Sequence, residues 1–164
     1  ILCAAQNPCP CGFLGDSVHR CSCKQSEIDS YKRKISGPLM DRIDMQINLS
    51  RVEFSELKTK EKGESSAAIR ERVVKARLLQ QERLEALGMH CNAQMGRSEV
   101  VKYCQLDAAA QNVMERYFNM LNLSARSHDR ILKVARTIAD LAGSENIEAV
   151  HLAEAIQLRT SVRQ

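Results

Sequence analysis

The sequence contains no tryptophan, only 4% aromatic residues and only three prolines. Sheet sandwiches depend on aromatic and β-branched side chains, so a composition rich in alanine and leucine favours packed helices instead. No apolar stretch approaches the roughly 20 residues that span a bilayer, and the first residues lack the positive charge of a signal peptide. We therefore expect a mainly α-helical protein that is cytoplasmic and has no membrane segment.

A phosphate-binding loop is also missing, because the sequence contains no GxxxxGK[ST] motif and no strand that ends in paired acidic residues. The chain begins at Ile1, within an apolar run typical of a buried strand, so we interpret it as a fragment of a longer protein. Such a fragment should not hydrolyse ATP alone. The net charge of +4 is compatible with nucleic acid but does not identify it as a partner.

The first third of the chain combines short strand patterns with an irregular segment. Residues 1–5 form an apolar run that ends at Asn7-Pro8, which predicts the end of a buried strand. Residues 45–49 alternate between apolar and polar, which predicts a second strand with one buried face. We assign residues 1–52 to the remnant of an α/β core that contains these two short strands and a cysteine-rich loop.

The remaining two thirds of the sequence have helical patterns. A charged stretch with few large apolar residues predicts a linker over 53–63, and residues 64–164 should form an all-α domain. Together with a short helix at 26–34, the predicted helices are one that ends at Leu87 before Gly88, then 98–106, 107–121, 124–143, and one that begins at Ile147. Asp107 and Ser124 are expected to be N-caps.

Two of these helices have apolar residues at helical spacing, which should mark their buried faces. The buried positions expected in these two helices are Ile69, Val73, Ala76, Ile131, Ala135, Ile138 and Leu141.

On the second helix Arg126, Arg130 and Lys133 form a basic face, and for Arg130 and Lys133 this face is equally consistent with solvation and with function. The run Ser127-His128-Asp129 resembles a catalytic triad. Adjacent helical residues point in different directions, so we reject that interpretation.

Four cysteines follow a CxC-x9-CxC pattern, at Cys9, Cys11, Cys21 and Cys23, in a loop without a core of its own. Four thiolates can hold zinc tetrahedrally and stabilise such a loop, with His19 as a substitute ligand. CxC is less usual than CxxC, so free reduced thiols remain the alternative. The other three cysteines are expected to be small core residues, and they are Cys3, Cys91 and Cys104.

Three segments carry a family resemblance, and they occur in order: AAQNPCPCG at 4–12, SGPLMDRID at 36–44 and LSARSHDRILKVARTIADL at 123–141. Together they resemble the magnesium-chelatase-like AAA+ ATPases, within which the YifB/ComM branch is most similar and the MCM helicases are more distant. The resemblance implies an α/β core followed by a helical lid domain. It also implies that the whole protein uses ATP and magnesium.

The resemblance implies roles for three residues. Asn7 matches the sensor-1 position, which orients water and the γ-phosphate, although Asn before Pro is also common in turns. Arg42 matches an arginine finger that acts on the neighbouring subunit's ATP, although a surface ion pair is the simpler alternative. Arg126 matches the sensor-2 position, where it would contact ATP phosphate.

For the whole protein, the resemblance implies a homo-oligomer, a hexameric ring that acts as an ATP-driven DNA motor in recombination or DNA uptake. One alternative is a chelatase-type remodeller that uses ATP to drive metal insertion by a partner. Another is a non-enzymatic helical adaptor stabilised by zinc. DNA-stimulated ATPase activity would separate the first two interpretations, and a phosphate-binding loop elsewhere in the protein would exclude the third.

Overall fold

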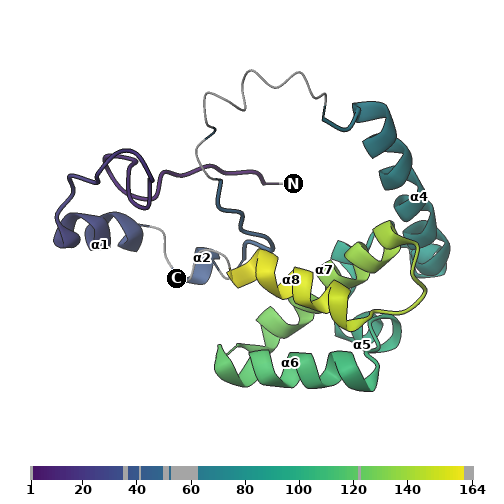
Figure 1. Cartoon of the computed structure of the whole chain (residues 1–164). Helices are drawn as coiled ribbons and strands as arrows, with labels where there is room; N and C mark the ends of the chain where they lie inside the picture. The colour runs from purple at the N-terminus through teal and green to yellow at the C-terminus, as the bar shows by residue number, and fades with distance from the viewer. Residues whose placement is uncertain are drawn as a thin grey trace. The chain divides into compact units, whose positions relative to one another are not determined.

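The computed structural model describes residues 2–34, 37–40, 42–49, 52, 63–121 and 123–160. Contacts divide the chain into two compact units, which are described separately. Unit 1 comprises Ile1–Ile43 and Leu49–Thr59, and unit 2 comprises Asp44–Asn48 and Lys60–Gln164. Most of the described residues are helical (Figure 1), which confirms the predicted fold class. None of the helices in these ranges is long and apolar enough to cross a membrane.

The described part of unit 1 has two helices and a long irregular segment. The helices are α1, Gln25–Arg33, and the one-turn α2, Gly37–Met40. At the start of α1 the backbone N–H of Lys24 donates to the Glu27 carboxylate at 2.7 Å, which satisfies one donor at the helix N-terminus. Ile28 is the buried residue of α1, which confirms a short helix after the cysteine loop.

The two predicted strands do not form over the residues that the structure describes. Residues 2–5 and 45–49 are irregular, and Leu2 and Leu49 are 72% and 91% exposed. A strand needs a neighbour for its backbone groups, and no described segment pairs with either stretch. Within unit 2, the Gln46 N–H instead donates to the Leu158 carbonyl at 2.6 Å. Ile1 and most of the predicted linker lie outside the described residues.

Unit 2 is a bundle in which α7 has a central position. Its helices are α4, Ser66–Leu84; α5, Arg97–Tyr103; α6, Ala108–Met120; α7, Ala125–Ala142; and α8, Ala149–Thr160. Two short 3₁₀ turns, η1 at Glu85–Leu87 and η2 at Asn92–Gln94, lie between α4 and α5. α7 contacts α4, α5 and α8, while α6 packs on α8 (Figure 1).

The predicted helix ends are confirmed by cap geometry. The Asp107 carboxylate accepts from the Ala110 N–H at 2.7 Å, and the Ser124 hydroxyl accepts from the Ser127 N–H at 3.2 Å. Gly88 and Gly143 have φ of +69° and +70°, a left-handed conformation in which glycine ends a helix without strain. One side-chain cap typically stabilises a helix by about 1 kcal/mol, so local sequence fixes these boundaries.

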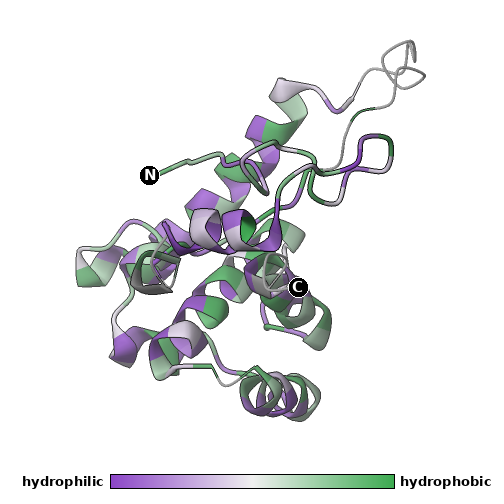
Figure 2. Ribbon diagram, turned by 90° about the vertical axis from the view of Figure 1, so that its left-hand side faces the viewer, coloured by the Kyte–Doolittle hydropathy of each residue, from purple (hydrophilic) through white to green (hydrophobic). Residues whose placement is uncertain are grey.

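The core of unit 2 lies around α7 and α8. Ile131, Ala135, Leu152 and Ile156 are each at most 2% exposed. Figure 2 shows hydrophobic and hydrophilic residues alternating along the helical ribbons. The predicted apolar stripe of α7 is confirmed at Ile131 and Ala135. It is wrong at Leu141, which is 38% exposed near the end of the helix.

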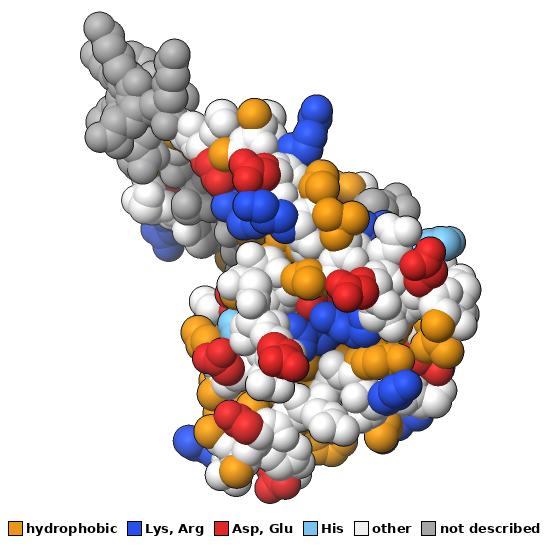
Figure 3. Space-filling model, turned by 90° about the vertical axis from the view of Figure 1, so that its right-hand side faces the viewer, with side chains coloured by type: hydrophobic (Ala, Val, Ile, Leu, Met, Phe, Trp, Pro, Cys, Tyr) orange, Lys and Arg blue, Asp and Glu red, His pale blue; other side chains and the backbone are white. Residues whose placement is uncertain are grey.

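The first half of α4 departs from the prediction. Ala76 is buried, but Ile69 and Val73 are 41% and 44% exposed. The buried residues of α4 begin at Ala76. Ile69 and Val73 precede it, in a part of the helix that no described segment covers. Figure 3 views the side of the molecule on which α4 lies in Figure 1, and hydrophobic side chains there are interspersed with charged ones.

Candidate functional site

The structure brings the four loop cysteines together. Cys9 Sγ lies 3.4 Å from Cys11 Sγ and 3.7 Å from Cys21 Sγ, and Cys11 and Cys21 are 3.6 Å apart. All four Sγ atoms, including that of Cys23, lie within 4.8 Å of one another. Cys9 is fully buried and the other three are half-buried. The thiols of the two CxC pairs, with Cys9 and Cys21 12 positions apart in sequence, thus lie side by side.

Local backbone geometry produces this convergence. The Gly12 N–H donates to the Cys9 carbonyl at 3.0 Å, which closes a tight turn between the first two ligands. Gly12 has φ +83°, a conformation that side chains other than glycine rarely adopt. Farther along, the Asp16 carboxylate accepts from the backbone N–H groups of Val18 and His19 at 2.8 and 2.7 Å. This second turn returns the chain toward Cys21.

The cluster has the dimensions of a zinc site. Zinc–thiolate bonds are about 2.3 Å long, so the sulfur atoms of a regular tetrahedron are separated by about 3.8 Å. The three Sγ separations given above, 3.4 to 3.7 Å, are close to this value. The described cluster consists of four cysteines, a ligand set typical of structural rather than catalytic zinc sites. The residues present therefore fit one zinc ion.

The thiols of the cluster differ in acidity. Backbone hydrogen bonds at Phe13 and Ser22 lower the pKa of the Cys11 thiol from 9.0 to about 5. A backbone hydrogen bond at Cys11 acts in the same direction on Cys23, but burial and the neighbouring thiols outweigh it and raise the Cys23 pKa to about 12. One thiolate thus forms readily, and it disfavours further ionisation until a cation is present.

The remaining candidates in the loop have other environments. His19 is not among the clustered ligands, because its ring stacks on Phe13 with centroids 4.9 Å apart.

The expectation of three core cysteines outside the cluster holds only for Cys104, which is 3% exposed. Cys3 is exposed and Cys91 is half-buried, so burial was overestimated for both.

Asn7 and Arg42 are both exposed residues of unit 1. The Asn7 amide lies beside the cysteine loop, since a Cβ atom at Gly12 would be 3.8 Å from Asn7 Nδ2. The Arg42 N–H donates to the Leu39 carbonyl at 2.9 Å, which continues the turn of α2 by one residue. The structure therefore places each side chain at a surface and does not by itself assign it a role.

Arg126 lies in the first turn of α7, in unit 2. Its side chain is exposed and forms no hydrogen bond or ion pair with any described residue. The backbone around it is fixed, because the Ser124 cap holds the Ser127 N–H directly after it. The Arg126 guanidinium therefore extends from a capped first turn of helix, next to the positive end of the helix dipole.

The other basic residues of this face have partners within unit 2. Arg130 pairs with Asp44 at 2.5 Å, and Lys133 donates to the Ala93 carbonyl at 3.3 Å. They are therefore not simply solvated. The Ser127 hydroxyl binds Ser124 and Arg159, and among the described residues it has no hydrogen bond to a histidine that would support a triad.

Sequence reasoning missed a buried polar network between α4, η2 and α7. The fully buried Asp140 carboxylate accepts from Arg83 at 2.6 and 3.1 Å, from Asn92 at 2.8 Å and from Arg136 at 3.0 Å. Arg136 also donates to the Ser144 and Glu145 carbonyls beyond the end of α7. The i,i+4 spacing of Arg136 and Asp140 was a visible signal, but Arg83 is 57 positions away from Asp140.

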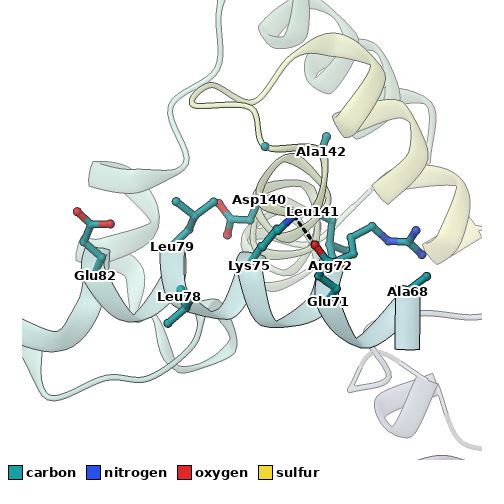
Figure 4. Close-up of a pocket in the computed structure, with 11 residues that line it drawn as sticks. Ala68, Glu71, Arg72, Lys75, Leu78, Leu79, Glu82, Asp140, Leu141 and Ala142 are labelled. Carbon is teal, nitrogen blue, oxygen red and sulfur yellow. Dashed lines mark ion pairs between the residues drawn. The ribbon is translucent and has the colours of Figure 1, made fainter. Parts of the chain in front are cut away.

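A groove in unit 2 does not coincide with the candidate residues. A groove of about 720 Å³ runs between α4 and the end of α7 (Figure 4), and its walls include Leu78, Leu79 and Leu141. An ion pair between Lys75 and Glu71 spans 2.8 Å along its α4 side. Arg126 does not line this groove. We therefore do not interpret it as a nucleotide site.

Comparison with known proteins assigns both parts of the chain to one family. Residues 63–159 match the family described as magnesium chelatase, subunit ChlI C-terminal, and residues 1–57 match magnesium chelatase, subunit ChlI. The chain belongs to the magnesium chelatase ChlI family. These matches support a C-terminal AAA+ region.

Individual relatives agree with the YifB/ComM branch. Competence protein ComM of Haemophilus influenzae is 40% identical over 99% of this chain and 31% of that protein. The protein YifB of Escherichia coli is 37% identical over 96% of this chain and 30% of its own length. A protein of Mycobacterium tuberculosis is 31% identical over 96% of this chain and 31% of its own length. The chain thus spans about a third of the length of these curated relatives.

Proposed function

We propose that this chain contributes ATP-sensing and subunit-bridging residues to a ring-shaped AAA+ ATPase that moves along DNA. The observation that carries the proposal is Arg126, an exposed guanidinium in the rigid first turn of α7 that has no partner among the described residues. Family membership over both parts of the chain supports it, and so does the name of one relative, a competence protein.

Each candidate has a distinct role in this proposal. Arg126 contacts nucleotide phosphate, and its charge adds to that of the helix dipole. Asn7 orients the attacking water and the γ-phosphate, a task of positioning rather than covalent chemistry. Arg42 acts on the ATP bound by a neighbouring subunit. Magnesium neutralises charge on the phosphates when it is bound, and the rest of the nucleotide site lies outside this chain.

Arg42 provides the sharpest test, because a residue that acts between subunits can be complemented. Loss of an arginine finger typically costs ~10³ to 10⁵ in rate, and lysine cannot replace its bidentate fork. In the whole protein, Arg42→Ala and a variant disabled in its phosphate-binding loop should each be inactive. Mixed rings contain some interfaces with an intact loop and an intact Arg42, so ATPase activity should partly return. Exchange of subunits without any recovery would refute a role in trans.

We also propose that the four loop cysteines bind one zinc ion with a structural role. The Sγ separations support this, because the described contacts that otherwise hold the loop are short hydrogen-bonded turns and the Phe13–His19 stack. Unit 1 has only two fully buried hydrophobic residues among those described, Cys9 and Ile28. A metal would supply the folding free energy that so small a core cannot.

The family description favours one alternative, a chelatase-type remodeller that uses ATP to drive a metal-inserting partner. ATPase activity of the whole protein distinguishes the two. A DNA motor should be stimulated by DNA, and a remodeller should respond to its protein partner instead. Absence of DNA stimulation over a range of single-stranded and duplex substrates would reject the motor.

A further inference from the structure

The loop between the two cysteine pairs exposes two stacked rings. The Phe13 and His19 centroids lie 4.9 Å apart with planes at 29°. Phe13 is 40% exposed and the side chain of His19 is 49% exposed. His19 is not one of the four clustered cysteine ligands, and Phe13 has no ligand atom. Two exposed rings that a short, tightly turned loop holds in a stack can accept another flat group against an open face.

The charges beside these rings favour an anion. The exposed side chains of Arg20 and Lys24 form no hydrogen bond or ion pair with the residues that the structure describes. The acidic residue in this loop, Asp16, is only 13% exposed, and its carboxylate is occupied by the N–H groups of Val18 and His19. The loop therefore offers cations to a ligand while its carboxylate is held internally.

We propose that Phe13 and His19, together with Arg20 and Lys24, form a contact site for single-stranded DNA. This inference rests on the proposed DNA motor and names the part of the chain that would touch its substrate. A base stacks on the rings, and the two cations bind flanking phosphates. Stacking requires an unpaired base, because bases in a duplex are covered by their neighbours. The contact tolerates any sequence, since every base has a flat face.

The test uses this chain loaded with zinc and a fluorescein-labelled oligo(dT), with binding measured by fluorescence anisotropy. Phe13→Ala should weaken binding about tenfold, as expected for the loss of one stacking partner. Phe13→Trp should restore it. Arg20→Gln should reduce the dependence of log affinity on log salt by about 0.7, the contribution of one phosphate contact to a single strand. The matched control is Tyr117→Ala, an aromatic residue of α6 that is 36% exposed, which should leave binding unchanged.

A second readout does not depend on any variant. An oligonucleotide that contains 2-aminopurine should lose fluorescence on binding the unmodified chain, because stacking quenches this base. Binding without quenching, or undiminished binding by zinc-loaded Phe13→Ala, would overturn the proposal. A preference for duplex DNA would also overturn it. If whole-protein ATPase is still stimulated by DNA in those cases, only this contact is rejected. Loss of both responses would reject the motor as well.

Discussion

Replacement of Asp140 by asparagine should destabilise unit 2 strongly. The Asp140 side chain is fully buried and accepts four hydrogen bonds, two of them from Arg83 and one each from Asn92 and Arg136. Asparagine has nearly the same shape but no charge, and its amide NH₂ would face groups that are themselves donors. Two guanidinium groups would then lose their counterion.

The burial of the partners sets the magnitude. Removal of one partner from a buried ion pair typically costs 3–5 kcal/mol. Arg136 is 3% exposed, but Arg83 is 19% exposed and can recover some hydration. We therefore expect a loss of about 3 kcal/mol, at the lower end of that range. For a domain of about 100 residues this lowers Tm by roughly 12–24 °C.

Urea unfolding followed by far-ultraviolet circular dichroism measures this loss. Glu71→Gln is the matched control, because Glu71 pairs with Lys75 at 2.8 Å while both side chains are mostly exposed. It should not measurably shift the unfolding midpoint. In the Asp140→Asn background, Arg83→Met should cost less than in the unmodified chain, since its partner is already absent. A loss below about 1 kcal/mol for Asp140→Asn, with an unchanged m-value, would refute this account of the network.

Three further predictions concern metal, thiols and nucleotide. Chain purified without chelators should contain one zinc ion by elemental analysis; Cys9→Ser should abolish zinc binding, and Cys104→Ser should retain it. In the zinc-loaded chain a thiol reagent should modify Cys3 and Cys91 first. Cys104 should resist until unfolding, because burial raises its pKa to about 12 and keeps it protonated below that pH; its rapid modification at mildly alkaline pH would contradict the structure. Calorimetry should detect only very weak ATP binding to this chain, and micromolar affinity would mean that the main phosphate contacts lie within it.

The parts of the fold that sequence predicted well are those determined locally. Asp107 and Ser124 cap helices because a short acceptor side chain can reach an N–H three residues ahead. Gly88 and Gly143 end helices because glycine adopts positive φ without strain. The convergence of the four cysteines was also predicted, since two CxC pairs in a loop without a core of its own suit a tetrahedral metal site.

The failures all depend on neighbours that a pattern does not specify. Residues 45–49 alternate like a strand, but alternation does not supply a partner, and Leu49 remains 91% exposed. Ile69, Val73 and Ala76 recur at helical spacing, yet only Ala76 is buried. The bonds of Arg83 to Asp140 depend on tertiary packing between residues 57 positions apart, which no local rule predicts.

The packing of α7 determines which helices of unit 2 would respond to phosphate bound at Arg126. The helix has 18 residues and is therefore about 27 Å long. Arg126 lies in its first turn, and Asp140, near its other end, connects it to α4 through Arg83. Between these ends Ile131 and Ala135 are fully packed. A helix capped at both ends and buried along one face moves as a rigid rod, because local melting would expose its core and break the network. Under the proposed role of Arg126, we therefore expect α7 and α4 to respond to phosphate as one unit rather than through reordering of one turn.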